Sequence, residues 1–530
     1  MKRSEMLHKV QNMSEIWDLI IIGGGATGLG TAVDAASRGF KTLLLERDDF
    51  AKGTSSRSTK LVHGGVRYLQ QGNVSLVMEA LAERGLLIQN AGHLVRNQPF
   101  LVPHYDWWEG PYYGLGLKVY DMLAGKLGLG SSKHLSRKKT LECVPTLVPE
   151  GLRGGVIYYD GQFDDSRLAI NLAKTSAEHG GVLLNYMKVT GLLKYKETIQ
   201  GVKAIDTLNN EEYTIKARCV INATGVFTDS VLKMDDPDSK PIIVTSQGIH
   251  IVVDKHFLPG DTAIMIPHTD DGRVLFAVPW HNKVILGTTD TPVDCISSEP
   301  RAMNNDIEFL LNHASKYLSA HPSRSDVRSV FAGLRPLVKM DNMKKTATLS
   351  RDHTVIVAPS GLVTITGGKW TTYRKMAEDV VDQASIVAGL PPVQCVTENL
   401  RIHGWLKNMD KEDPLYYYGS DKLEIQKLVD QNPDLGNKLH ERLPYIKAEV
   451  IWATRNEMAM TVEDVSSRRT RALLLDTKAS EEMAPEVARL MALEADYDDM
   501  WIKSQVESYR ELARSYQLQS RQDAGISLLI

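Results

Sequence analysis

A run of glycines near the amino terminus limits the fold of this chain more than any other feature. Residues 17–22 (WDLIII) predict a buried parallel strand, because they form a short apolar run rich in isoleucine. Residues 23–28 (GGGATG) follow at once with the spacing GxGxxG. Residues 30–38 then predict a helix, and residues 41–46 (KTLLLE) predict the next strand. Together these segments predict one βαβ unit of an α/β fold.

Each glycine of this motif has its own physical role. Gly23 permits a tight turn, Gly25 lets the backbone approach a pyrophosphate, and Gly28 allows the helix to pack closely on the strand. The amide hydrogens and the dipole of the helix stabilise the bound anion. Glu46, at the end of the second strand, can accept hydrogen bonds from ribose hydroxyls. The motif predicts a dinucleotide site but does not separate FAD from NAD.

Size, charge and cysteine content exclude several other classes of protein. The 530 residues exceed the roughly 250–300 at which a single core stops growing, so we expect two or three domains. The net charge of −3 gives no global reason to expect nucleic-acid binding. The four cysteines include no CxxC pair and no calcium-loop motif occurs, so we expect no metal site and a reducing compartment. Residues 1–17 lack the apolar segment of a secretory signal, so we expect a cytoplasmic location or a place on a membrane face.

Residues 53–69 (GTSSRSTKLVHGGVRYL) form a second distinctive stretch. Small hydroxyl residues and glycines offer hydrogen bonds to a flat ring system without adding bulk. By composition alone, the same stretch is equally well read as a flexible loop followed by the start of a helix.

This stretch, after an amino-terminal GxGxxG motif, resembles the FAD-dependent glycerol-3-phosphate dehydrogenases of the D-amino-acid-oxidase-like superfamily. The resemblance covers about residues 17–380 and continues more weakly through 468–471 (RRTR). Further motifs agree with the family in the same order along the chain: Asp164-Asp165-Ser166-Arg167-Leu168, Asn222-Ala223-Thr224-Gly225, Gly248-Ile249-His250, Gly287-Thr288-Thr289-Asp290, Gly333-Leu334-Arg335-Pro336-Leu337, Arg351-Asp352 and Gly367-Gly368-Lys369-Trp370-Thr371-Thr372-Tyr373-Arg374.

The resemblance implies a glutathione-reductase-like Rossmann FAD domain, a β-rich substrate domain and a helical C-terminal domain. We expect the FAD domain at 17–100 together with about 150–240 and 350–395. We expect the substrate domain at about 100–150 together with 241–349, and the helical C-terminal domain at 400–530. The residue patterns agree, since alternating strands are predicted between 241 and 291 and helices at 421–430, 446–458 and 497–518.

The resemblance also implies non-covalent FAD and a set of residues that contact it. The implied cofactor residues are Gly23, Gly25, Ala26, Thr27, Gly28, Glu46, Arg47, Thr54, Ser55, Ser56, Lys60, Leu61, His63, Gly64, Gly65, Ala223, Thr224, Gly225, Gly368, Lys369, Thr371 and Thr372. We expect a strand at 217–225, a strand at 361–369 and a helix from Thr371, whose amino terminus can face the flavin.

The implied reaction oxidises sn-glycerol 3-phosphate to dihydroxyacetone phosphate, with hydride transfer from C2 to flavin N5. It needs a proton acceptor and fixed cations for the phosphate, and arginine suits phosphate because its fork matches the oxygens. His250 is the candidate base, Arg335 can stabilise the alkoxide, and His63 can lie against the flavin. The implied substrate contacts are Arg67, Tyr68, Arg335, Arg351, Lys369 and Asp290. The alternatives are that His250 is a satisfied sheet-edge histidine and that the arginines are surface ion-pair partners.

The family passes its electrons to quinone in membrane-associated forms and to oxygen in oxidase forms. Residues 107–139 bear on this choice, since they predict an amphipathic helix with flanking aromatic residues and a basic run. Leu115, Val119, Met122, Leu123 and Leu127 share one face, which packs either on a lipid headgroup layer or on the protein's own core. We favour a quinone-linked enzyme on the inner face of the cytoplasmic membrane.

Two other functions fit part of the pattern. An FAD-dependent amine or amino-acid oxidoreductase shares the same start, but one arginine would suffice for its carboxylate substrate. A non-catalytic flavoprotein would not need the arginine set at all. A homodimer is compatible with either type of enzyme.

Overall fold

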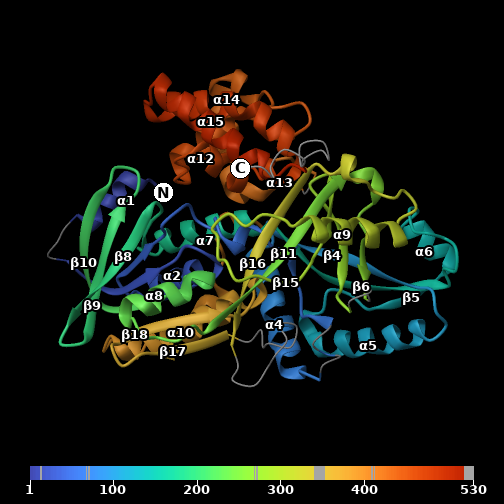
Figure 1. Ribbon diagram of the computed structural model, residues 1–530, viewed down its shortest axis with the longest axis horizontal. Helices are drawn as coiled ribbons and strands as arrows, with labels where there is room; N and C mark the ends of the chain where they lie inside the picture. Colours follow the sequence, from blue (N-terminus) through green and yellow to red (C-terminus); the bar gives the residue numbers. More distant parts are fainter. Residues whose placement is uncertain are drawn as a thin grey trace, which may run out of the picture.

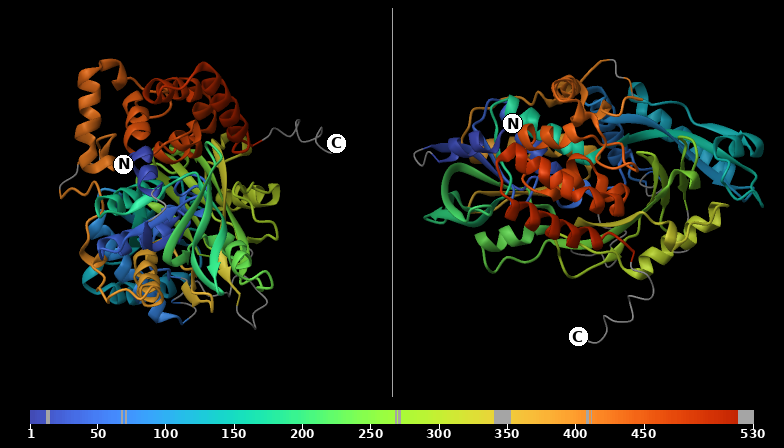
Figure 2. Two further views of the ribbon diagram at one scale, coloured as in Figure 1. Left: turned by 90° about the vertical axis from the view of Figure 1, so that its left-hand side faces the viewer. Right: turned by 90° about the horizontal axis from the view of Figure 1, so that it is seen from above.

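The computed structural model describes residues 1–518, apart from 12–14, 67, 68, 70, 71, 268, 270, 271, 340–352, 408, 409 and 411. Two large β-sheets lie side by side, with helices around them and a helical layer above (Figures 1 and 2). The mixed α/β class expected from the sequence is confirmed.

The first sheet has eight strands in the order β17-β18-β10-β1-β2-β7, with β8 and β9 attached through β10. Its strands are β1 (Ile16–Ile22), β2 (Thr42–Leu45), β7 (Val182–Leu184), β8 (Met187–Tyr195), β9 (Thr198–Asp206), β10 (Glu211–Asn222), β17 (His353–Val357) and β18 (Leu362–Gly367). β1 pairs in parallel with both β10 and β2. Because a central parallel strand is covered on both faces, β1 is apolar almost throughout, as the sequence predicts.

Helix α2 (Ala26–Ser37) follows β1 directly and packs against α7 (Asp165–Glu178) and α10 (Tyr373–Val387). The structure starts α2 within the glycine motif, four residues before the predicted helix at 30–38. This early start puts the first turn of the helix at the carboxyl end of β1. It also gives the glycine motif the helix amino terminus that an anion site requires.

The second sheet has ten strands, and most neighbouring pairs are antiparallel. Its strands are β3 (Leu61–Val62), β4 (Val95–His104), β5 (Lys133–Ser136), β6 (Gly154–Phe163), β11 (Ile243–Asp254), β12 (Ala263–Ile266), β13 (Leu275–Trp280), β14 (Lys283–Gly287), β15 (Thr291–Pro292) and β16 (Ser329–Val338). The antiparallel sheet predicted between 241 and 291 is therefore present. Residues 154–163, which the expected domain division places in the FAD domain, instead form β6 of this second sheet.

The remaining helices surround the sheets and form the upper layer. Around the sheets lie α1 (Arg3–Val10), α4 (Val74–Asn90), α5 (Glu109–Ala124), α6 (Arg137–Cys143), α8 (Thr228–Asp235) and α9 (Asn304–Tyr317). After residue 400 come α11 (Lys422–Gln431), α12 (Lys447–Asn456), α13 (Ala472–Leu475), α14 (Thr477–Ala495) and α15 (Asp499–Arg514). The orange and red helices α12 to α15 sit together above the sheets in Figure 1. The helices predicted at 421–430, 446–458 and 497–518 correspond to α11, α12 and α15, whereas no prediction covered α14.

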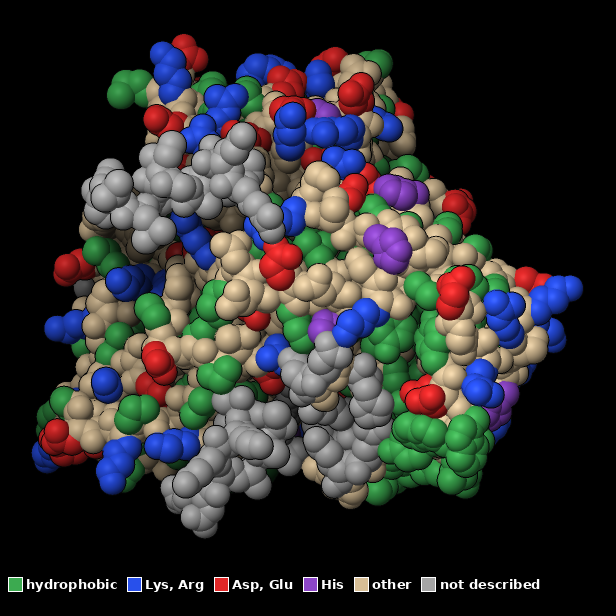
Figure 3. All heavy atoms as spheres, turned by 45° about the vertical axis from the view of Figure 1, so that its right-hand side comes forward, with side chains coloured by type: hydrophobic (Ala, Val, Ile, Leu, Met, Phe, Trp, Pro, Cys, Tyr) green, Lys and Arg blue, Asp and Glu red, His purple; other side chains and the backbone are tan. Residues whose placement is uncertain are grey.

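Helix α5 is apolar on two sides. Tyr113, Leu117 and Tyr120 are buried on the inner side, whereas Leu115 is 71% exposed and Met122 is 79% exposed. Three exposed aromatic residues lie close to them in the sequence: Trp107 and Trp108 just before the helix, and Tyr112 in its first turn. Figure 3 shows hydrophobic side chains gathered at the lower right, where Figure 1 places α5. Leu115 and Met122 thus do not pack on the protein's own core. None of the described helices is long and apolar enough to cross a membrane.

Candidate active site

A cavity of about 500 Å³ runs between the two sheets and collects most of the residues singled out from the sequence. From the implied sites it is lined by Gly23, Gly25, Ala26, Thr27, Glu46, Arg47, Thr54, Ser55, Leu61, His63, Ala223, Thr224, Gly225, His250, Arg335, Gly368, Lys369 and Thr371. These residues come from the carboxyl ends of β1, β2, β10 and β18 and from strands of the second sheet. The carboxyl edge of the parallel strands is where open α/β sheets bind their ligands.

The glycines at one end of the cavity are required by its geometry. Gly23 has φ +111°, and a Cβ there would lie 2.7 Å from the Ala223 carbonyl oxygen. A Cβ on Gly28 would lie 1.9 Å from the Gly23 carbonyl oxygen, so Gly28 keeps the helix close to the turn although it does not line the cavity. The amide of Ala26 donates to Ser55 Oγ at 2.9 Å. The first turn of α2 therefore opens onto the cavity and can receive an anion.

Glu46 stands at the end of β2 and is held by two backbone amides. Gly24 N–H donates to Oε2 at 2.6 Å and Asp48 N–H donates to Oε1 at 2.9 Å. Burial nevertheless raises the pKa of this carboxyl to about 7, because the two hydrogen bonds only partly offset the loss of water. A carboxylate has more acceptor sites than these two donors fill, so Glu46 can still accept hydroxyl donors from a ribose.

The loop of residues 54–63 forms the middle of the cavity wall and is tied to distant strands. Thr54 Oγ1 donates to the Leu334 carbonyl of β16 at 2.6 Å. The indole of Trp370 donates to the Ser55 carbonyl at 2.9 Å, and the amide of His63 donates to Thr371 Oγ1 at 3.2 Å. The loop is thus fixed between the two sheets.

Some implied cofactor residues lie behind this wall. Lys60 is fully buried, and its Nζ lies 2.7 Å from Asp165 and 2.6 Å from the Ser56 carbonyl. It anchors the loop from inside and does not face the cavity. Ser56, Gly64, Gly65 and Thr372 are likewise absent from the lining.

Arg335 lies at the other end of the cavity, opposite Ser246 in the pairing of β16 with β11. Its Nη1 donates to Asp290 Oδ1 at 3.1 Å, and its Nη2 donates to Thr288 Oγ1 at 3.0 Å. Ser246 Oγ also donates to Asp290. A Cβ on Gly248 would lie 2.2 Å from Arg335 Nη2, so this glycine makes room for the guanidinium.

His250 lines the same end of the cavity and is kept neutral. Burial lowers its pKa well below the ordinary value, and the nearby positive charges of Arg335 and Lys60 lower it further. Its ring stacks on Phe331 with centroids 4.9 Å apart, and Nε2 lies 2.9 Å from the hydroxyl of Thr59. A neutral imidazole has a ring nitrogen that can accept a proton. The same burial and positive charges make it a weak base, so its proton donor must itself be made more acidic by the neighbouring cation.

The sequence interpretation missed Thr59 and Thr288, which orient His250 and Arg335. Thr59 lies in the stretch 53–69 and Thr288 in the motif 287–290, so their positions within these motifs could have indicated a role in the site. Three of the implied substrate residues, Arg67, Tyr68 and Arg351, lie outside the described residues. Lys369 lines the cavity, and Asp290 stands behind it as the partner of Arg335.

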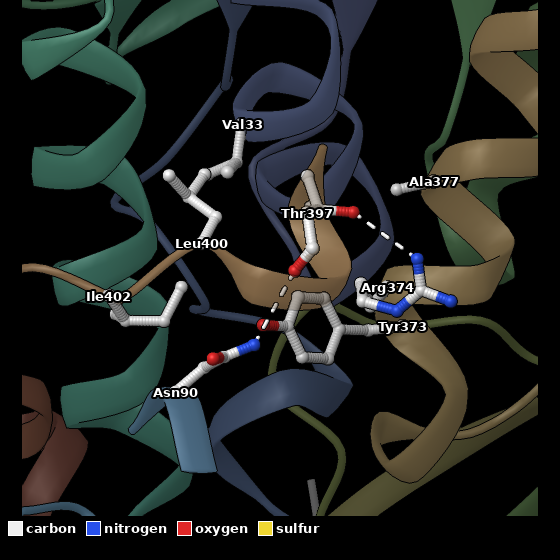
Figure 4. Close-up of a pocket in the computed structure, with 9 residues that line it drawn as sticks. Val33, Asn90, Tyr373, Arg374, Ala377, Thr397, Leu400 and Ile402 are labelled. Atoms are coloured by element: carbon white, nitrogen blue, oxygen red, sulfur yellow. Dashed lines mark hydrogen bonds between the residues drawn. The ribbon is translucent and has the colours of Figure 1, made fainter. Parts of the chain in front are cut away.

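A smaller hollow lies elsewhere, between α2, α4 and α10 (Figure 4). Here Asn90 Nδ2 donates to the Thr397 carbonyl at 3.4 Å, and Arg374 Nη1 donates to the hydroxyl of Thr397 at 3.3 Å. Apolar side chains such as Val33 and Leu400 line the rest of it. These hydrogen bonds anchor the segment that leads to the C-terminal helices. The hollow shares no lining residue with the large cavity.

Comparison with protein families agrees with this geometry. The family described as FAD-dependent oxidoreductases matches residues 18–374, which is well over half of the chain. The chain belongs to the FAD-dependent oxidoreductase family. A second family, the C-terminal domain of alpha-glycerophosphate oxidase, matches residues 363–500.

Individual relatives of this FAD-dependent oxidoreductase agree with the resemblance seen in its motifs. The mitochondrial glycerol-3-phosphate dehydrogenase of Homo sapiens is 41% identical over 99% of this chain and 78% of its own length. The mitochondrial glycerol-3-phosphate dehydrogenase of Arabidopsis thaliana is 39% identical over 95% of this chain and 87% of its own. The solved glycerol-3-phosphate dehydrogenase of Bacillus halodurans, complexed with FAD, has a TM-score of 0.79 and 30% identity over 98% of this chain and 99% of its own.

FAD is the cofactor of this oxidoreductase, and the cavity suits it. The helix amino terminus and Glu46 stand at one end, where a pyrophosphate and a ribose need a dipole and an acceptor. A Cβ on Gly225 or on Gly53 would meet no atom within 4 Å, so the lining leaves open space beside the backbone. His250 and Arg335 also line this cavity, so a neutral imidazole and a guanidinium face the same space.

Proposed function

We propose that this protein oxidises sn-glycerol 3-phosphate to dihydroxyacetone phosphate with FAD. The observation that carries the proposal is Arg335, held by Asp290 and Thr288 beside the neutral His250 in the FAD cavity. A fixed guanidinium suits an anionic substrate, and a neutral imidazole suits an alcohol proton. The names of the human, plant and bacterial relatives supply the identity of the substrate.

In this reaction the bound FAD supplies the acceptor for the hydride that leaves C2 of the substrate. His250 takes the proton of the C2 hydroxyl, and the hydroxyl of Thr59 keeps the imidazole oriented through Nε2. Arg335 stabilises the negative charge that develops on the C2 oxygen as the proton departs. Lys369 adds a cation to the lining, and Arg67 and Arg351 stay predictions for the phosphate contacts.

An anaerobic bleaching experiment tests the substrate. The visible flavin absorbance of the purified protein should fall on addition of glycerol 3-phosphate and should persist with glycine or D-amino acids. His250→Asn should slow bleaching by about 10²–10⁴-fold, because a general base contributes about that factor. Bleaching by an amino acid alone would favour the amine oxidoreductase, and an absorbance that no substrate changes would favour a non-catalytic flavoprotein.

We also propose that the electrons pass to quinone at a membrane surface. The exposed apolar side of α5 supports this, together with the exposed basic residues Lys133, Arg137, Lys138 and Lys139 that follow it. Aromatic and aliphatic side chains enter the headgroup layer, while the basic residues attract anionic lipids.

Vesicle sedimentation and two acceptor assays test this second proposal. The protein should sediment with anionic vesicles, and the double variant Leu115→Glu and Met122→Glu should stay in the supernatant. Reduced enzyme should be reoxidised faster by a soluble quinone than by air. Faster reoxidation by air would make the protein an oxidase.

The homodimer stays a prediction, and analytical ultracentrifugation of the purified protein would test it.

A further inference from the structure

The segment of residues 48–57 has two contacting sides. One side lines the FAD cavity, with Lys52, Thr54, Ser55 and Arg57 among its lining residues. The other side meets the helical C-terminal layer through a set of charged contacts. Among the described residues, none that lines the cavity lies beyond Thr371, so the C-terminal helices do not touch this space themselves.

Asp49 makes the innermost of these contacts. It is fully buried and accepts hydrogen bonds from Arg468 Nε at 2.5 Å and Arg469 Nη1 at 2.7 Å. Both arginines lie in one short turn of π-helix, Asp464–Arg469. Asn185 also donates to Asp49 at 3.2 Å, so the two arginines of the C-terminal domain supply the charged partners of this buried carboxylate and Asn185 supplies a neutral one.

Lys52 and Arg57 make two further contacts. Lys52 Nζ lies 2.7 Å from both carboxylate oxygens of Glu463, which also pairs with Arg468. Arg57 Nη2 donates to Glu299 at 2.7 Å, and the hydroxyl of Tyr516 donates to the same Glu299 oxygen. Two basic side chains of the FAD cavity are therefore oriented by groups that stand outside it.

The boundary beside these pairs is hollow. A second cavity of about 350 Å³ lies between this segment and α15, and Asp48, Lys52, Glu463 and Gln505 are among its lining residues. Apolar packing is therefore interrupted there, and the ion pairs provide the direct contact across the gap. Asp48 and Lys52 line both cavities, so they form the partition between them.

We propose that the helical C-terminal domain retains FAD by holding the segment 48–57 in place. It does so directly through Asp49 and Lys52, and indirectly at Arg57, where Tyr516 donates to the Glu299 carboxylate that pairs with Arg57. Because Lys52, Thr54, Ser55 and Arg57 line the cavity, movement of this part of the wall removes groups that face the cofactor and favours its release. The ion pairs across the boundary must then break together with the contacts to the cofactor, so they slow its release. This inference depends on FAD binding and not on the identity of the substrate.

Glu463→Gln tests the proposal, with Glu494→Gln as the matched control. Glu494 pairs with Arg455 of α12 at 2.7 Å, so this ion pair lies within the C-terminal domain and does not involve the segment 48–57. FAD release is followed as the rise of flavin fluorescence after dilution, and the melting temperature of each apoprotein is measured in parallel. Glu463→Gln should release FAD about 10-fold faster, because a partly buried ion pair contributes about that factor. Glu494→Gln should release it at the wild-type rate.

Two further readouts separate retention of the cofactor from general loss of stability. Excess FAD should restore most of the turnover of Glu463→Gln, so that the dissociation constant for FAD rises more than kcat falls. Tyr516→Phe, which leaves the Arg57–Glu299 pair intact, should release FAD about 2-fold faster. Release at the wild-type rate in both variants would overturn the proposal. Slower release from Glu463→Gln would also overturn it, since Lys52 would then bind the cofactor better without its C-terminal partner.

Discussion

The two ends of the FAD cavity are built in different ways. At the end expected to hold the nucleotide, most of the groups are backbone amides and one carboxylate from the stretch between residues 22 and 46, with residues 223–225 beside them. At the end proposed to hold the substrate, they are side chains of β11 and β16 and of the turn after β14, brought together by strand register. A local motif therefore specifies the first end, whereas the second end requires the whole second sheet.

Replacing a glycine at the nucleotide end should have the largest effect. In Gly28→Ala the new methyl would lie 1.9 Å from the Gly23 carbonyl oxygen, so the turn or the helix must shift. We expect FAD affinity to fall by about 100-fold or more, because the backbone has no rotamer with which to escape. The flavin content of the purified protein measures this. Gly116→Ala, where a Cβ meets nothing within 4 Å, is the control, and equal flavin in both variants would contradict the local account.

Replacing the arginine should break the other end alone. We expect Arg335→Ala to lower kcat/KM by about 10³-fold, which is about 4 kcal/mol, while flavin content stays near normal. Arg335→Lys keeps the charge but loses the fork that spans Asp290 and Thr288, so it should fall between alanine and wild type. Steady-state kinetics with glycerol 3-phosphate check both variants. A loss of flavin in Arg335→Ala would mean that the two ends are not independent.

Acidity should affect the nucleotide end through Glu46. Burial raises the pKa of Glu46 to about 7 in the protein without ligand, and ribose hydroxyls that donate to it favour its charged form. FAD binding then releases a proton, so affinity rises with pH up to about 7 and levels off above it. Between pH 7 and pH 6 the dissociation constant should grow by up to about 5-fold, as titration of the apoprotein would measure. The nearby Asp48 raises the pKa of Glu46 and Arg47 lowers it. Glu46→Gln is the control because it removes the titrating group, and its affinity for FAD should not change with pH over that range.

Removing one hydrogen bond behind the arginine should give the smallest effect. Thr288→Val deletes the hydroxyl that accepts from Arg335 Nη2 at 3.0 Å but keeps the ion pair with Asp290. We expect KM to rise about 5-fold, which is about 1 kcal/mol, with kcat changed less. A KM within experimental error of wild type would show that Asp290 alone fixes the guanidinium.

The same difference explains what could be predicted from the sequence. The strand, glycine turn, helix and Glu46 were all predicted, because their spacing is local and each glycine has a steric reason. Asp290, the ion-pair partner of Arg335, was expected at this site. Thr59 and Thr288 were not predicted, since only the folded chain brings them to His250 and Arg335 from distant positions in the sequence.

Lys60 shows the limit of motif reasoning. Its motif lies in the cavity wall, yet the side chain turns inward to Asp165, more than a hundred positions away. A motif gives the place of a segment but not the direction of each side chain. The C-terminal helix α14 was not predicted, and Pro485 in its interior is a residue that ordinarily argues against a continuous helix.

The wide separation of the cavity walls has a consequence for how the enzyme is made. Among the described residues the lining runs from Ile22 to Thr371, so a growing polypeptide on the ribosome carries the glycine turn long before the rest of the cavity wall has been made. Binding of FAD within the complete cavity must therefore come late in synthesis.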